Sequence, residues 1–161
     1  MNEVVVVNEK DEVVGTMLRE EAHKTSVPHR IAVVYVTNPK GEILIQVRMS
    51  GKLDHSSAGH LDPGETYEQA AYRELKEELG IEGVKLMAVG SGRVDEPRFN
   101  SVHVFKIFSC AAEPKQLQKD EVKDVYWKDP KTVWEEMKND PNDDIYTRCF
   151  KKTLQIYFNF S

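Results

Sequence analysis

The sequence has few cysteines, no long apolar run and no excess of basic residues. Its two cysteines, Cys110 and Cys149, lie far apart and outside any C-x-x-C spacing, which argues against a disulfide framework and against a zinc site. The formal net charge is −5, so the chain lacks the basic surface of non-specific nucleic-acid binders. We therefore expect packed, reduced thiols and no nucleic acid polymer as a partner.

A membrane-spanning or secretory segment is also missing from the pattern. The longest apolar runs, such as Val4–Val7 and Ile31–Val36, have the length of strands, and the first residues, MNEVVVVNEK, lack the long apolar core of a secretory signal. We expect a soluble, cytoplasmic protein with no membrane partner. The 161 residues, 40% hydrophobic and 30% charged, suffice for one buried core, and we expect a single domain over residues 1–161.

Hydrophobic patterning and turn signals predict an α+β chain with an N-terminal β-hairpin. The predicted strands are Val4–Val7, Val13–Leu18, Arg30–Thr37, Glu42–Arg48, Val84–Val89, Ser101–Ser109 and Val122–Trp127. The predicted helices are a short turn in REEAHK (19–24), Thr66 to Gly80, Val133–Lys138 after Asp129-Pro130, and Asp144–Phe158. The turn Asn38–Gly41 predicts a second hairpin. Residues 49–65 (MSGKLDHSSAGHLDPGE) favour a shaped loop, because they hold three glycines and a proline.

The stretch RELKEELG (73–80) places three glutamates on one helical face. Glu74, Glu77 and Glu78 are spaced i, i+3 and i+4, so their charges repel one another within about one turn. Arg73, as the i+4 partner of Glu77, is expected to neutralise only one of the three. A solvated face or chance would explain E-x-x-E-E alone, but the glycine-bearing turn and Glu65 lead directly into this helix. The combination favours a site for Mg²⁺, which binds carboxylate oxygens and substrate phosphates.

Residues 59–81, GHLDPGETYEQAAYRELKEELGI, resemble the Nudix box: G, five residues, E, seven residues, then REUxEExGU, where U is bulky and aliphatic. All nine specified positions match. The resemblance implies the Nudix fold, an α/β/α sandwich with a mixed β-sheet flanked by helices. It also implies a role for each matched residue. By this resemblance, Glu74, Glu77, Glu78 and the Gly59 carbonyl bind the metal. Glu65 is a supporting carboxylate, and Arg73 orients the glutamates.

Flanking segments resemble isopentenyl-diphosphate isomerase, a Nudix-fold enzyme. They are EEAHK, PHRIAVVYVTNPKGEILIQVR and SSAGH. In that isomerase, the histidines that match His23, His29 and His60 bind a metal, which implies an accessory metal or phosphate site here. Its acid-base cysteine is replaced by Ala58, and its strand glutamate is absent, with Asn100 nearest that place. A methyl group cannot transfer a proton, so the isomerase mechanism loses its principal group.

We therefore expect a hydrolase on the isomerase-like branch, using Mg²⁺ or Mn²⁺ to direct water at the phosphorus of a nucleoside diphosphate, alone or linked to another moiety. Glu77 or Glu74 would serve as the base, and Glu121, before the strand VKDVYW, as a further ligand or base. The cations expected at the small-molecule substrate are Arg48, Lys52, Arg93 and Arg98. An isomerase-like enzyme and a non-catalytic nucleotide-binding module remain alternatives. Apolar patches on the N-terminal hairpin and in YFNF pack either within the chain or in a homodimer.

Overall fold

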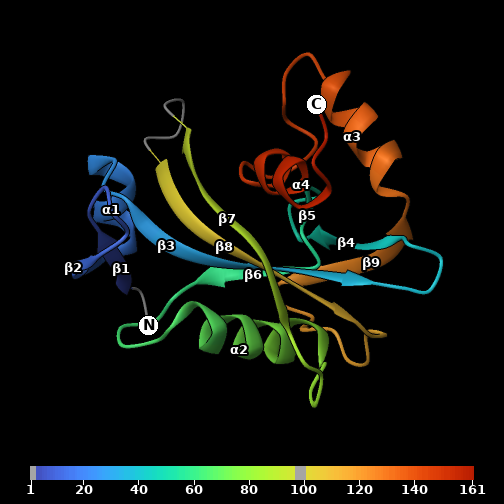
Figure 1. The fold of residues 1–161 in the computed structure, drawn as a ribbon, viewed down its shortest axis with the longest axis horizontal. Coiled ribbons are helices and arrows are strands. Elements are labelled where there is room, and N and C mark those ends of the chain that lie inside the picture. Colours follow the sequence, from blue (N-terminus) through green and yellow to red (C-terminus); the bar gives the residue numbers. More distant parts are fainter. Residues whose placement is uncertain (1–2, 97–100) are drawn as a thin grey trace.

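The computed structural model describes residues 3–96 and 101–161, whose strands form one nine-stranded sheet. The strands are β1 (Glu3–Val7), β2 (Val13–Leu18), β3 (His29–Thr37), β4 (Ile43–Arg48), β5 (Leu53–Asp54), β6 (Ser57–His60), β7 (Met87–Glu96), β8 (Ser101–Ala111) and β9 (Val122–Lys128). The helices are α1 (Arg19–Thr25), α2 (Tyr67–Leu79), α3 (Pro130–Lys138) and α4 (Phe150–Phe158). Helix α2 covers one face of the sheet, and α3 and α4 cover the other (Figure 1). The α/β/α sandwich with an N-terminal hairpin is confirmed.

Strand β3 organises the sheet because four other strands pair with it. Its whole length pairs in parallel with β8, while Ile31 to Val34 pair antiparallel with β6, which makes the sheet mixed, as expected. The ends of β3 contact β1 through His29 and β4 through Thr37. The side chains of β3 alternate between two cores: Val34 packs with Leu75 of α2, and Val33 packs with Phe150 of α4.

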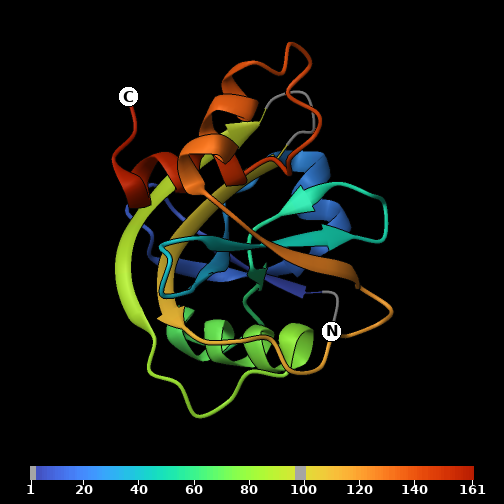
Figure 2. The ribbon, with the colours of Figure 1, turned by 90° about the vertical axis from the view of Figure 1, so that its right-hand side faces the viewer.

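The sheet divides between β3 and β4. The expected turn at 38–41 joins them, but within the described residues they pair only through Thr37 and Ile43, and β4 then pairs with β5 and β9. Ser56 lies in the division, where its Oγ accepts a hydrogen bond from the Val36 N–H at 2.8 Å and donates one to the Leu44 carbonyl at 2.7 Å. The second hairpin therefore exists at its turn alone, and β5 and β6 extend the two sides of the division by pairing with β4 and β3 (Figure 2).

Helix α2 has the boundaries that the sequence predicts. The Thr66 hydroxyl accepts a hydrogen bond from the Gln69 N–H while the Gln69 side chain accepts one from the Thr66 N–H, which is a complete capping box. Gly80 ends the helix with a left-handed φ of 68°. The acidic residues are therefore held on a helix with a fixed start and a fixed end.

Several predicted boundaries and one predicted loop are wrong; α3 begins at Pro130 rather than Val133, and β8 ends at Ala111 rather than Ser109. The 49–65 segment contains β5 and β6, because β6 pairs with the exposed edge of β3, although its residues show no strand-like alternation. Strand β7 begins at Met87 rather than Val84 and includes 91–96, where no side chain is buried and hydrophobic patterning therefore fails to mark a strand. Helix α4 begins at Phe150, because the Ile145 carbonyl and the Thr147 N–H bond to the backbone of Leu53 instead of forming helical bonds.

Both cysteines are free and buried, as expected. Among residues 3–96 and 101–161, no helix combines the length and apolarity needed to cross a membrane.

Candidate functional site

Two of the three glutamates of α2, Glu74 and Glu78, lie against strand β6, and the three differ in exposure. The Glu78 Oε1 accepts hydrogen bonds from the Ser57 hydroxyl at 2.7 Å and the Ala58 N–H at 3.1 Å. The Glu74 side chain is 14% exposed, whereas that of Glu77 is 55% exposed. The cluster therefore runs from a buried carboxyl to one that faces solvent.

Gly59 makes the close approach of α2 to β6 possible. A Cβ atom at this position would lie 2.3 Å from the Glu74 Cδ, well inside van der Waals contact. Any side chain would displace the Glu74 carboxyl. The glycine of the box is thus explained here by packing, because strand β6 passes directly beside the Glu74 carboxyl.

Arg73 contacts more of the acidic residues than the helical spacing predicted. Its Nη1 donates to Glu74 Oε1 at 2.7 Å and to Glu77 Oε2 at 3.4 Å, so its single positive charge is shared by two of the three glutamates. Its Nε and Nη2 donate to the two oxygens of Glu65 at 2.7 and 2.8 Å, and Nη2 donates to the His60 carbonyl at 3.1 Å. These bonds join the loop to the helix and lower the pKa of Glu65.

The carboxyls nearest β6 hold their protons more tightly than ordinary glutamates. Burial raises the pKa of Glu74 to about 7, the Arg73 contact opposes the rise, and the charges of Glu77 and Glu121 add to it. Burial raises the pKa of Glu78 to about 8 against the hydrogen bond from Ser57. A positive charge placed among these groups would favour their ionised forms. Glu121, exposed in the turn before β9, is close enough to act on Glu74 electrostatically.

The cations expected around the substrate are dispersed. Arg48 donates to Asp54 at 3.0 Å and Lys52 pairs with Asp144 at 2.9 Å, both beside the division of the sheet. Arg93 lies on β7, where it pairs with Asp95 at 2.8 Å, and strands β8 and β3 separate it from β6. Arg98 and Asn100 lie outside the described residues.

The opposite face of the sheet carries a histidine cluster, formed by His23, His29, His60 and His103. Their potential ligand atoms all lie within 4.8 Å of one another. His23 comes from α1, His60 from β6, and His29 pairs in register with His103 across β3 and β8. The sequence left His103 unassigned, because only the parallel register of two strands distant in sequence brings it beside His29.

The histidine cluster holds unprotonated nitrogen atoms away from solvent. Among the described residues, the buried Nε2 atoms of His29 and His60 have no hydrogen-bond partner. Burial lowers the pKa of His60 to about 2 and that of His103 to about 3, and neighbouring positive charges lower them further. The His29 Nδ1 lies 3.0 Å from the Val27 carbonyl, which favours the tautomer with a lone pair on Nε2. Neutral imidazoles with free lone pairs are the form that binds transition metals.

His55 lies apart from this cluster in a buried network. Its Nδ1 lies 2.8 Å from Asp54 Oδ1 and its Nε2 2.7 Å from the Thr153 hydroxyl, which also contacts the Tyr35 hydroxyl at 2.8 Å. All four side chains are buried. The network fixes α4 to the sheet and has no access for a substrate.

The fold and the carboxylates of α2 together indicate a protein family. Residues 27–149 match the model of the NUDIX domain, and the chain belongs to the Nudix hydrolase family. It is 33% identical over 138 residues to the uncharacterized Nudix hydrolase YfcD of Escherichia coli (strain K12), covering 81% of this chain and 75% of that protein. Isopentenyl-diphosphate Delta-isomerase of Corynebacterium diphtheriae is 32% identical over 143 residues, covering 79% and 78%.

Solved structures agree on the fold. The crystal structure of DR0079 from Deinococcus radiodurans superposes with a TM-score of 0.81 at 22% identity, covering 97% of this chain and 99% of that one. The chain therefore stands on the isomerase-like branch of the Nudix superfamily, with Ala58 in place of the isomerase cysteine.

Proposed function

We propose that this chain is a Mg²⁺-dependent hydrolase, active also with Mn²⁺, that cleaves the diphosphate linkage of a small molecule. The substrate class is a nucleoside diphosphate, alone or linked to another moiety, and the reaction is attack of water on phosphorus. The observation that carries the proposal is the acidic face of α2, where Glu74 and Glu78 are held against β6 and Glu77 is more exposed. Its support lies in the family and in the oxygen-rich donor set.

The potential ligand atoms on this face of α2 are oxygens, which suit Mg²⁺. Carboxylate oxygens of Glu74, Glu77 and Glu78, with the Gly59 carbonyl, are hard donors of the kind that this ion prefers. When bound, the ion supplies charge for the diphosphate oxygens and a more acidic water. Gly59 leaves room for Glu74, and the Ser57 and Ala58 donors hold Glu78.

The remaining residues have positioning and proton-transfer roles in this proposal. Arg73 and Glu65 join the loop to the helix and hold Glu74 beside β6. Glu77, the most exposed of the three, accepts the proton of the attacking water, with Glu74 as the other choice of base. Glu121 adds a carboxylate from the turn before β9. Arg48 and Lys52 are the described cations near the division of the sheet that would contact the phosphates.

A substrate screen in ¹⁸O-labelled water tests the reaction. Nucleoside diphosphates and triphosphates, nucleotide sugars, dinucleotides and coenzyme A would be incubated with Mg²⁺ or Mn²⁺, and the products weighed by mass spectrometry. We expect ¹⁸O in a phosphate group of one product, because water attacks phosphorus. Label in a non-phosphate product, or no turnover of any diphosphate, would contradict the proposal.

Glu77→Gln, with Lys76→Gln as the matched control, assigns the reaction to this face of α2. Lys76 is exposed and pairs with Glu82 at 3.0 Å. We expect Glu77→Gln to lose at least about a hundredfold in turnover and Lys76→Gln to stay near wild type. Equal rates in both variants, with unchanged circular dichroism, would remove the carboxylates from the mechanism.

The isomerase alternative has a specific basis in the relatives and the histidine cluster. It predicts migration of the double bond of isopentenyl diphosphate without phosphate release, observable by proton NMR. Ala58 supplies no acid or base for that step, so we expect no migration. Saturable nucleotide binding with no turnover under any metal would instead indicate a binding module.

We also propose that the histidine cluster binds one divalent transition metal, as an accessory site separate from the carboxylates. Four neutral imidazoles and no carboxylate form a donor set that suits Zn²⁺ or its neighbours better than Mg²⁺. Metal analysis of chelator-stripped protein after Zn²⁺ titration should give about one tightly held ion in wild type and in Glu77→Gln. Absence of saturable Zn²⁺ binding in both would overturn this assignment.

A further inference from the structure

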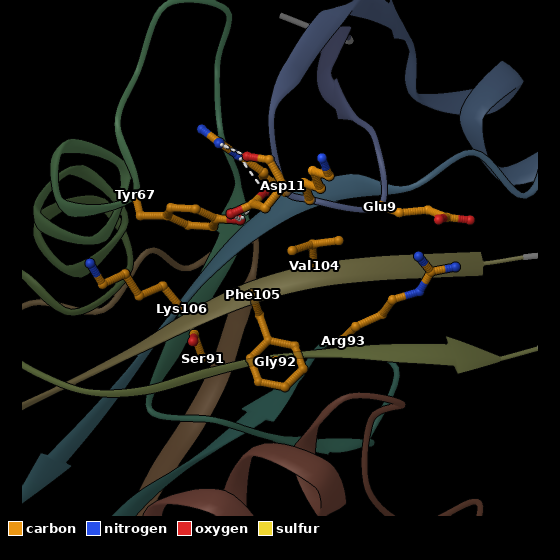
Figure 3. Close-up of a pocket in the computed structure, with 11 residues that line it drawn as sticks. Glu9, Asp11, Tyr67, Ser91, Gly92, Arg93, Val104, Phe105 and Lys106 are labelled. Atoms are coloured by element: carbon orange, nitrogen blue, oxygen red, sulfur yellow. Dashed lines mark hydrogen bonds and ion pairs between the residues drawn. The ribbon is translucent and has the colours of Figure 1, made fainter.

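A cavity of about 630 Å³ lies on the α2 face of the sheet. It is lined by the β1–β2 turn at Glu9 to Asp11, by residues of β3, β7 and β8, and by Tyr67, the first residue of α2. Figure 3 shows the side chains of Tyr67, Val104 and Lys106 around it. Its volume falls in the range of small-molecule sites.

Helix α2 separates this cavity from the carboxylates. Ala32 of β3 pairs in register with Gly59 of β6 on one side and with Lys106 of β8 on the other. Two strand spacings, about 10 Å, therefore separate Gly59 from Lys106. Glu74 lies over Gly59, α2 packs over Ala32, and Lys106 lines the cavity on the far side. The histidine cluster lies on the opposite face, because His103 alternates along β8 with Val104.

Lys106 is the unusual residue of this cavity. It is half-buried on a strand that has neighbours on both sides, and among the described residues its Nζ has no carboxylate partner. Its Nζ lies 5.8 Å from the centroid of the Phe108 ring, which is a contact with an aromatic face and not a charge pair. A lysine ammonium without a carboxylate partner is available to bind an anion.

Arg30 is positioned at the same cavity by two neighbours. Its Nε donates to Asp11 Oδ1 at 2.9 Å and its Nη2 to the Asp11 carbonyl at 2.6 Å, while its guanidinium lies 4.7 Å from the centre of the Tyr67 ring. The Tyr67 hydroxyl donates to both Asp11 oxygens at 3.0 Å, so the Asp11 charge is already shared between two donors.

Positive charge exceeds negative charge in the lining. The cationic side chains are Lys10, Arg30, Arg93 and Lys106, and the acidic ones are Glu9 and Asp11, which leaves an excess of two positive charges. Arg93 is shared with Asp95 outside the lining. A lining of this kind, with the Val104 side chain and a tyrosine ring between the cations, suits an anion attached to an organic group.

We propose that this cavity binds a phosphorylated small molecule as a second, non-catalytic site, with the phosphate contacting Lys106 and Arg30. The organic part contacts Val104 and the Tyr67 ring. Because Tyr67 begins the helix that carries the three glutamates, the bound molecule contacts the same rigid element from its other side.

Binding without turnover tests the site. The Glu77→Gln chain, without added Mg²⁺ or Mn²⁺, would be titrated with ADP and with inorganic pyrophosphate by calorimetry. We expect saturable binding that weakens at least tenfold when Lys106→Gln is added and recovers with Lys106→Arg. We expect ADP to bind more tightly than pyrophosphate, and equal binding would overturn the contact of the organic group with Val104 and Tyr67.

Lys152→Gln, at an exposed residue of α4 on the other face, is the matched control for the loss of one positive charge. Thermal unfolding of each variant checks that the fold is kept. Binding that is unchanged by Lys106→Gln, or equally weakened by Lys152→Gln, or absent altogether, would overturn the proposal. The measurement involves no hydrolysis, so its outcome is independent of the proposed enzyme activity.

Discussion

The two candidate metal sites share one four-residue strand and differ in almost every other respect. Ser57 and Gly59 of β6 face α2, where they contact Glu78 and Glu74. His60 faces the other way, into the histidine cluster. One site has oxygen donors that reach solvent and an arginine that holds them, while the other has nitrogen donors, two of which are buried without a hydrogen-bond partner among residues 3–96 and 101–161.

This difference teaches that donor chemistry can be separated by the alternation of a single strand. Successive side chains of a strand point to opposite faces, so adjacent residues can serve a hard cation on one side and a softer one on the other. We expect the two sites to be separable by mutation, and the following predictions rank the variants by the size of the expected effect.

Glu78→Gln should have the largest effect. The amide oxygen still accepts the hydrogen bonds from Ser57 and Ala58, so the fold is kept, but one ionisable oxygen donor is lost. We expect turnover of the diphosphate substrate to fall about 10²- to 10³-fold. Zn²⁺ content, measured in the same preparation, should stay at the wild-type value. Loss of both properties would show that the two sites are not separable.

His103→Leu should produce the converse result. Removing one imidazole should weaken Zn²⁺ affinity by about 10- to 100-fold, as measured by competition with a chromophoric chelator. Hydrolysis with Mg²⁺ should remain within about twofold of wild type, because His103 faces away from α2. A large loss of hydrolysis would join the two sites into one functional unit.

Gly59→Ala sharpens the comparison at the strand that both sites share. The new Cβ would lie 2.3 Å from the Glu74 Cδ, so the carboxyl must move, and we expect about a tenfold loss of kcat. The unfolding free energy should fall by about 1 to 3 kcal/mol from overpacking. Chemical denaturation at 25 °C separates the two effects. Wild-type kcat in this variant would mean that the position of Glu74 is not critical.

Asp54→Asn tests the pair of Asp54 and His55, because His55 has a carboxylate partner and the histidine cluster does not. Burial opposes ionisation of Asp54, but the hydrogen bond and charge of His55, with Thr147 and Arg48, lower its pKa to about 2. A lowered carboxyl pKa stabilises the fold above the unfolded value of 3.8 and loses that contribution as the pH falls toward 2.

We therefore expect Asp54→Asn to destabilise the chain by roughly 1 to 2 kcal/mol at pH 7. The difference from wild type should shrink between about pH 4 and pH 2, as followed by urea denaturation. A difference that stays constant over this interval would mean that the carboxylate charge contributes nothing to the fold.

The sequence predicted the parts of this molecule that depend on local pattern. The capping residues Thr66 and Gly80 and the spacing of the box are properties of contiguous residues, so helix α2 and its acidic face were predictable. The resemblance to the isomerase, rather than any pattern, named three of the four histidines.

What the sequence could not predict depends on pairing between distant strands. The position of His103 beside His29 requires the register of β3 with β8, which follows from the whole sheet. The bonds from Arg73 to Glu65 and to the His60 carbonyl depend on how the loop before α2 folds back, so helical spacing alone could not predict them. The predicted start of α4 was wrong because the backbone of Leu53 forms hydrogen bonds with Ile145 and Thr147, just before the helix.

The sharing of β6 restricts how this chain can change in evolution. Because side chains alternate along a strand, a single residue inserted or deleted within SAGH would exchange its two faces. His60 would then point toward α2, and Gly59 would no longer lie beneath Glu74. A one-residue insertion or deletion in β6 would therefore abolish both sites together, although point substitutions could remove either one alone.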